Sequence, residues 1–260
     1  VTASGGRAMT LHSPGTPRWV ADWLRSRRFP PTVPEKADAP QILGLTGRIR
    51  PRDLHHTVYT AESLLEEVTP FVNEAIAQGV EILAALNECD WPTEGAGVSY
   101  AGPIELSKLL LKFQALAGAR WPRVQWLMPA MTYSPQGRDW FEALVRMGAH
   151  EAFAGIALHG YADTIDGMIA VANDHLAIAK RFPHHFIVVN ELGLTTNVTG
   201  VSEEGKAQLA AAYINHVAPR TDNIKVVHWF TSYTTKPEHK HMQATPAMAR
   251  TVAQLKPVWA

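Results

Sequence analysis

Short apolar runs alternate with longer segments of helical spacing along almost the whole chain. Each run holds four to seven residues, mainly Val, Ile and Leu, without regular polar alternation, which is typical of parallel strands covered on both faces. The runs occupy residues 7–11, 41–45, 80–86, 124–128, 153–158, 186–189 and 224–230. The helical segments occupy residues 17–28, 61–78, 103–117, 138–147, 164–181, 203–217 and 246–255. This order predicts an α/β fold with a parallel sheet.

Two parallel architectures fit this order of elements. A doubly wound open sheet carries a Gly-rich turn after a strand, and neither GxGxxG nor GxxxxGK[ST] is found. A (β/α)8 barrel typically has about 250 residues, so we predict one TIM barrel that forms a single catalytic domain over residues 1–260. A barrel needs an eighth strand, and we assign residues 31–35, within a proline-rich stretch, as a degenerate second strand.

Composition excludes several classes of partner and cofactor. The 24 Lys and Arg residues balance 24 Asp and Glu residues, so no net charge attracts nucleic acid or an anionic membrane. The apolar runs reach only about half of the ~20 residues that a membrane-spanning helix needs. The one cysteine, Cys89, cannot form an internal disulfide or a thiolate metal site alone, and we expect it to pack in the core.

Polar and aromatic residues follow the ends of several predicted strands, where a parallel barrel places its functional site. The fourth strand ends in Asn87-Glu88, and the seventh ends in Asn190-Glu191. Two glutamates at strand ends, each preceded by asparagine, form the most informative pattern in the chain. Further candidates at strand ends or in the loops that follow them are His12, Arg48, Trp91, His159, Tyr161 and Trp229.

A pair of carboxyl groups is the chemistry that glycoside hydrolysis requires. One protonates the leaving oxygen, and the other acts from the opposite side of the sugar ring, about 5–5.5 Å away in retaining enzymes and about 6.5–9.5 Å away in inverting ones. Burial and a like-charged neighbour keep one of the two protonated near neutral pH. Strands three positions apart face one another across an eight-stranded barrel, so we predict that Glu88 and Glu191 form such a pair. Trp229 is a candidate sugar-stacking floor.

These residues together resemble the clan A glycoside hydrolases, which are retaining (β/α)8 enzymes with catalytic glutamates on strands four and seven. The resemblance covers residues 7–257 in element order and rests on a few short matches. It implies that Glu88 is the acid/base and Glu191 the nucleophile of an enzyme that cleaves O-glycosidic bonds in an oligo- or polysaccharide. A covalent glycosyl-enzyme intermediate is implied, and no cofactor is required.

The same resemblance implies roles for four further residues. Asn87 would bond the sugar 2-hydroxyl, His159 would lie near the acid/base, Tyr161 would contact the nucleophile, and Trp229 would floor the subsite at the cleaved bond. Trp91 is a second candidate platform. A secreted or extracellular location is favoured, although no signal-peptide pattern opens the chain.

The sequence departs from the family pattern at one position and leaves rival interpretations open. The family supplies an arginine from strand two, which the degenerate second strand lacks, so Arg48 or Arg50 would have to substitute. One rival is therefore a carbohydrate-binding barrel without catalysis. Another is a metal-dependent barrel hydrolase that uses the histidine clusters at residues 55–56, 184–185 and 239–241. If these residues have only structural roles, the two glutamates are surface carboxylates, and Tyr161 and Trp229 pack at the top of the barrel.

Overall fold

The computed structural model describes residues 8–12, 42–43, 46–48, 59–77, 82–91, 102–195 and 200–230. The chain divides into two compact units, one formed by residues 1–44 and 160–260 and the other by residues 45–159. The predicted helices at residues 17–28 and 246–255 and the predicted second strand at residues 31–35 lie outside the described residues.

The unit of residues 45–159 contains consecutive parallel strands. They are β3 (Thr46–Arg48), β4 (Ile82–Ala84), β5 (Gln125–Met128) and the beginning of β6 (Gly155–Tyr161). Thr46 of β3 lies opposite Ile82 of β4, and Leu127 of β5 lies opposite Gly155 of β6. Each strand therefore pairs with the next one along the chain, as successive β/α units do.

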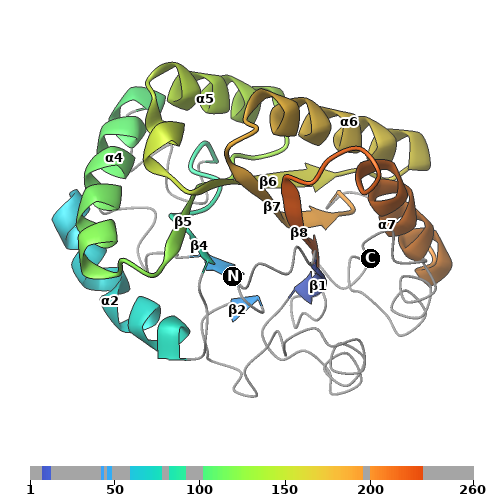
Figure 1. Ribbon diagram of the computed structural model, residues 1–260. Coiled ribbons are helices and arrows are strands. Elements are labelled where there is room, and N and C mark those ends of the chain that lie inside the picture. Colours follow the sequence, from blue (N-terminus) through green and yellow to red (C-terminus); the bar gives the residue numbers. More distant parts are fainter. Residues whose placement is uncertain are drawn as a thin grey trace. The chain divides into compact units, whose positions relative to one another are not determined.

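The helices of this unit lie along one side of its strands (Figure 1). They are α2 (Ala61–Ala77), α4 (Pro103–Arg120), α5 (Pro135–Arg146) and the short 3-10 helix η2 (Ala149–Ala152). Trp126 of β5 is buried, and its ring contacts the edge of Phe113 of α4 at a centroid distance of 5.4 Å. These large apolar side chains join helix and strand into one core.

The unit of residues 1–44 and 160–260 contains the first and last strands. It holds β1 (Ala8–His12), β2 (Ile42–Leu43), β7 (Phe186–Gly193) and β8 (Ile224–Phe230). Ala8 of β1 lies opposite Val226 of β8, and Ile187 of β7 lies opposite Ile224 of β8, both in parallel pairs. Pairing between the first and last strands is what barrel closure requires, and the classic doubly wound order lacks it.

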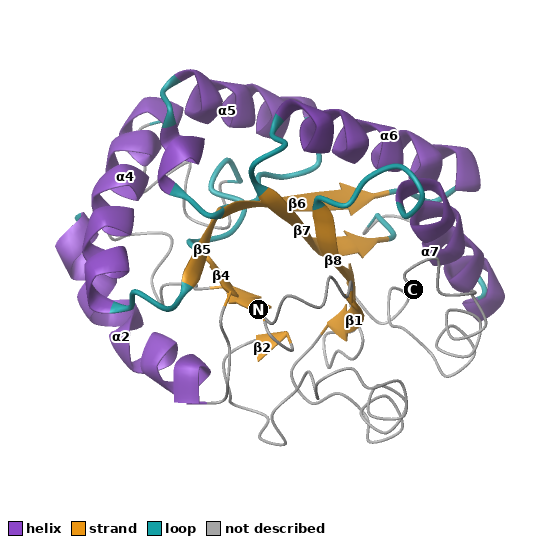
Figure 2. Ribbon diagram, viewed as in Figure 1, coloured by secondary structure: helices purple, strands orange, loops and turns teal. Residues whose placement is uncertain are grey.

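Two helices cover the strands of this unit, α6 (Ile165–Arg181) and α7 (Glu203–Val217), which lie side by side (Figure 2). A buried hydrogen bond of 2.7 Å joins Nδ1 of His175 in α6 to the Tyr213 hydroxyl in α7. Gly160 of β6 lets α6 approach closely, because a Cβ there would come within 2.4 Å of Val171. No helix within the described ranges has the length and apolarity to cross a membrane.

The predicted alternation of parallel strands and helices is confirmed, with one local correction. We predicted the third strand at residues 41–45, but the strand that pairs with β4 is Thr46–Arg48, and Ile42–Leu43 forms a separate short strand. Apolarity alone located the run, whereas the pairing partner sets where the strand lies. Helix α6 begins after Thr164, whose side chain accepts a hydrogen bond from the Gly167 amide.

Candidate active site

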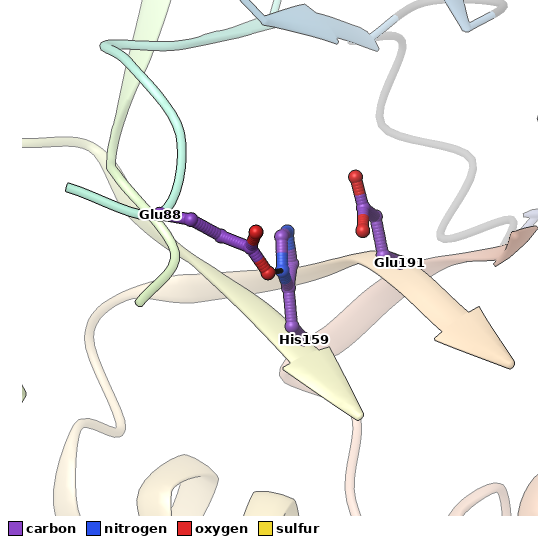
Figure 3. A group of neighbouring side chains, drawn as sticks. All are labelled: Glu88, His159 and Glu191. Carbon is purple, nitrogen blue, oxygen red and sulfur yellow. Dashed lines mark hydrogen bonds and ion pairs between the residues drawn. The ribbon is translucent and has the colours of Figure 1, made fainter. Parts of the chain in front are cut away.

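Glu88 lies in the loop that follows β4, within the unit of residues 45–159. Its amide donates a 2.8 Å hydrogen bond to the Ala130 carbonyl, which fixes the loop beside the residues that follow β5. The Glu88 side chain is 19% exposed, and its Oε1 atom lies 2.7 Å from Nδ1 of His159 (Figure 3). His159 thus contacts Glu88, as the resemblance implied.

The two members of this pair differ in burial. The His159 side chain is fully buried at the end of β6, so the imidazole is held against Glu88 and shielded from water. A hydrogen bond between the two needs one proton, which either the imidazole or the carboxyl group supplies. Because Glu88 remains part-exposed, its carboxyl group is accessible to a ligand while one oxygen stays anchored.

Glu191 lies in β7 of the other unit and has a different environment. Its side chain is buried, and the Tyr161 hydroxyl at the end of β6 donates a hydrogen bond to its Oε2 atom. The resemblance predicted this contact between Tyr161 and Glu191. The phenol hydrogen bond therefore fixes the orientation of a buried carboxyl group.

A β-bulge sets the position of Glu191. Between the pairs Val189–Val227 and Leu192–Trp229, β7 has two residues, Asn190 and Glu191, where β8 has one. Bulges of this kind bend the strand and re-aim a side chain, and they are frequent next to active sites. Because of this extra residue, Glu191 does not follow the regular alternation of side chains along the strand.

The structure shows the burial of some of the remaining predicted residues and only the backbone position of others. Asn87 is buried directly before Glu88, and Trp91, on the same loop, is 48% exposed. Trp229 is fully buried, so its ring offers no exposed face, and its predicted role as a sugar floor stays a prediction. In the strand register, His12 of β1 lies opposite Phe230 of β8, and Arg48 of β3 lies opposite Ala84 of β4.

The metal-site alternative gains no support from the histidine clusters that the structure describes. His184 is exposed, and the ring of His185 packs against Phe182 at 6.0 Å. Neither belongs to a group of three potential metal ligands within the described ranges. Arg50 and the clusters at residues 55–56 and 239–241 lie outside those ranges. Cys89 is buried, as expected for a packing role.

Sequence reasoning missed two carboxylates that tie neighbouring loops together. Asp90, two residues after Glu88, accepts hydrogen bonds from the amide and the hydroxyl of Thr132. Asp163, two residues after Tyr161, accepts the same two bonds from Thr195, at 2.9 and 2.6 Å. In both cases an aspartate in the loop after one strand binds a threonine in the loop after the next. The spacing differs between the pairs, so the sequence carries no repeat that would reveal them.

Comparison with known proteins identifies the fold. No protein-family model matches the sequence, and no curated protein matches it. A curdlan-specific exo-β-1,3-glucanase of the GH128 family from Blastomyces gilchristii, solved with glucose, is similar in structure, with a TM-score of 0.59 and 14% identity over 97% of this chain and 99% of that one. A GH128 endo-β-1,3-glucanase from Sorangium cellulosum has a TM-score of 0.57 and 14% identity over 95% and 97% of the two chains.

A third similar structure is a GH128 oligosaccharide-binding protein from Cryptococcus neoformans, with a TM-score of 0.51 and 11% identity over 76% of this chain and 79% of that one. At such identities the likeness shows the fold alone. That fold is a (β/α)8 barrel, which agrees with the fold that the resemblance to clan A glycoside hydrolases implied.

Proposed function

We propose that this protein is a retaining glycoside hydrolase whose single (β/α)8 catalytic domain spans residues 1–260. The observation that carries the proposal is the contrast between its two strand-end glutamates. Glu88 is part-exposed and hydrogen-bonded to an imidazole, whereas Glu191 is buried and receives a phenol hydrogen bond. An imidazole beside a carboxyl group supports proton exchange by an acid/base, and a phenol hydrogen bond orients a carboxylate for nucleophilic attack.

In the first step, a Glu191 oxygen attacks the anomeric carbon while the bond from that carbon to the leaving oxygen breaks. Glu88 donates its proton to the leaving oxygen, and a glycosyl ester of Glu191 remains. In the second step, Glu88 takes a proton from water, the water oxygen attacks the anomeric carbon, and Glu191 leaves as a carboxylate. Two inversions give net retention, and the mechanism requires that the two carboxyl groups stand about 5–5.5 Å apart around the bound sugar.

The residues around the glutamates act through this chain's own hydrogen bonds. His159 orients Glu88 and keeps a proton at the pair, and Tyr161 holds the Glu191 carboxylate in position for attack. Asn87 binds the sugar 2-hydroxyl, and Trp91 stacks on a sugar ring through its exposed face. His12 and Arg48 complete the substrate site in this proposal. No cofactor takes part.

A neutral β-1,3-glucan is the substrate class we propose. Two of the similar structures are named as β-1,3-glucanases, one of exo and one of endo action. A chain with balanced charge suits an uncharged polysaccharide. Degradation of such a polysaccharide outside the cell would fit the secreted location that the sequence resemblance favours.

The direct test is release of reducing sugar from laminarin and curdlan. We expect activity in the wild-type protein and none in Glu191→Gln, with Glu204→Gln, an exposed glutamate of α7, as the matched control that retains full activity. Full activity in Glu191→Gln would contradict the assignment of the nucleophile.

A non-catalytic carbohydrate-binding protein is the second candidate, favoured by the similar oligosaccharide-binding structure. Binding of laminari-oligosaccharides by calorimetry separates the two candidates. Binding accompanied by cleavage supports the hydrolase, whereas tight binding without cleavage of either polysaccharide supports the binding protein.

A further inference from the structure

The loop that carries Glu88 has an unfavourable backbone conformation. Leu86 has φ of 107° and Glu88 has φ of 41°, both in the region that side chains other than glycine rarely occupy. One such residue lies on each side of Asn87, so the backbone of the loop is strained at Glu88, the proposed acid/base. A conformation of this kind persists only where the surrounding structure enforces it.

Asp90 joins this loop to the neighbouring segment through hydrogen bonds. Its side chain is 1% exposed, and both carboxylate oxygens are used, one by the Thr132 amide at 2.9 Å and one by the Thr132 hydroxyl. The Asp90 carbonyl also accepts a 2.6 Å hydrogen bond from Nε2 of Gln136. A buried carboxylate needs its hydrogen bonds satisfied, and here every bond comes from the segment that follows β5.

The partner segment is itself held rigidly. The Thr132 hydroxyl lies 2.7 Å from the hydroxyl of Ser134, whose side chain accepts from the Gly137 amide and so caps helix α5. A Cβ at position 137 would come within 1.9 Å of the Thr132 carbonyl, so only glycine permits this approach. Asp90 is thus connected through Thr132 to the beginning of a regular helix, which resists displacement.

We propose that Asp90 is a positioning residue that holds Glu88 against His159. Its hydrogen bonds to Thr132, together with the bond from the Glu88 amide to the Ala130 carbonyl, keep the strained turn in place. Without them the turn relaxes toward ordinary φ values, and the Glu88 carboxyl group moves away from the imidazole. The kinetic part of this inference rests on the proposed function.

The test compares Asp90→Asn with Asp163→Asn. The asparagine side chain keeps one acceptor but loses the second, and the control removes the corresponding bond to Thr195 without touching the Glu88 loop. Each variant is assayed on a laminari-oligosaccharide, whose leaving group needs a proton, and on a 2,4-dinitrophenyl β-glucoside, whose leaving group does not. We expect Asp90→Asn to lower kcat/KM by about tenfold or more on the first and by less than about threefold on the second.

Asp163→Asn should change kcat/KM by the same factor on both substrates. Equal losses on both substrates in Asp90→Asn, or no loss on either, would overturn the positioning role, because a merely structural effect does not distinguish leaving groups. Thr132→Val, which removes only the hydroxyl donor, repeats the comparison if Asp90→Asn does not fold by circular dichroism.

A readout independent of activity is the ring ¹⁵N spectrum of His159, assigned by its loss in His159→Gln. We expect the His159 signals of Asp90→Asn to move toward those of Glu88→Gln, and signals identical to wild type would contradict the inference. If the wild-type protein cleaves neither substrate, the proposed function fails, whereas these spectra still decide whether Asp90 positions Glu88.

Discussion

Nδ1 of His159 lies 2.7 Å from a carboxylate oxygen of Glu88, and the imidazole is fully buried whereas the carboxyl group reaches solvent. The rigid partner is therefore the histidine at the end of β6, and the accessible partner is the glutamate in the loop after β4. A substrate that approaches Glu88 meets a carboxyl group whose second oxygen is already anchored. This arrangement distinguishes Glu88 from the buried Glu191 and leads to separate expectations for the two residues.

Removal of the Glu88 carboxyl group should slow cleavage that needs a proton donor more than cleavage of an activated substrate. We expect Glu88→Ala to cleave laminari-oligosaccharides at least about a hundredfold more slowly, because no proton reaches the leaving oxygen. A dinitrophenyl β-glucoside should still form the glycosyl-enzyme, and added azide should release a β-glycosyl azide, detectable by thin-layer chromatography. An α-glycosyl azide would contradict a covalent intermediate on the opposite side of the sugar.

The Tyr161 hydroxyl should matter for catalysis more than for the fold. Tyr161→Phe removes a hydrogen bond to a carboxylate, which is worth roughly 1.5–3 kcal/mol, so kcat should fall by about ten- to a hundredfold. Tyr59→Phe is the matched control, since the Tyr59 hydroxyl donates a 2.7 Å bond to Glu67, beside α2. Equal effects of the two substitutions on steady-state kinetics would contradict a specific role for Tyr161.

Burial raises the pKa of the Tyr213 phenol well above its ordinary value. The folded protein therefore keeps this proton at a pH where the unfolded chain, with a phenol pKa of about 10, releases it. The resulting stability is fully present below pH 10 and is lost as pH rises from there toward the folded-state pKa, by at most about 1.4 kcal/mol per pH unit. Urea unfolding between pH 9 and 11 should show a shallower decline for Tyr213→Phe, and parallel curves would contradict this expectation.

The elements with long repeated patterns were predictable from the sequence. Helix α7 was predicted at residues 203–217, where the structure has it, because its apolar period is a local signal. Its cap is local too, since the side chain of Ser202 accepts a hydrogen bond from the Gly205 amide. The third strand was placed too early because its position depends on β4, a partner 36 residues away along the chain at the pair Thr46–Ile82.

The residues of the candidate site were predictable from the sequence, but the contacts that hold them in place were not. The pairs Glu88–His159 and Tyr161–Glu191 follow from strand-end positions combined with a family resemblance. The bond from Thr132 to Asp90 joins residues 42 positions apart and has no periodic signature. The bulge at Asn190 and Glu191 arises from the count of residues on two paired strands, which neither strand reveals alone. The full burial of Trp229, the predicted sugar floor, was not foreseeable, because aromaticity at a strand end does not indicate exposure.

The central claim is that Glu191 forms a covalent bond to the sugar, and trapping of that species tests it most directly. The protein would be incubated with a 2-deoxy-2-fluoro-β-laminaribiosyl fluoride, whose ring fluorine slows the second step, and digested for peptide mass spectrometry. We predict that the peptide containing Glu191 gains the mass of the fluorinated disaccharide in the wild-type protein and in Glu204→Gln, and remains unlabelled in Glu191→Gln. Attachment of the label to Glu88, or hydrolysis of laminarin by a protein that never becomes labelled, would contradict the account.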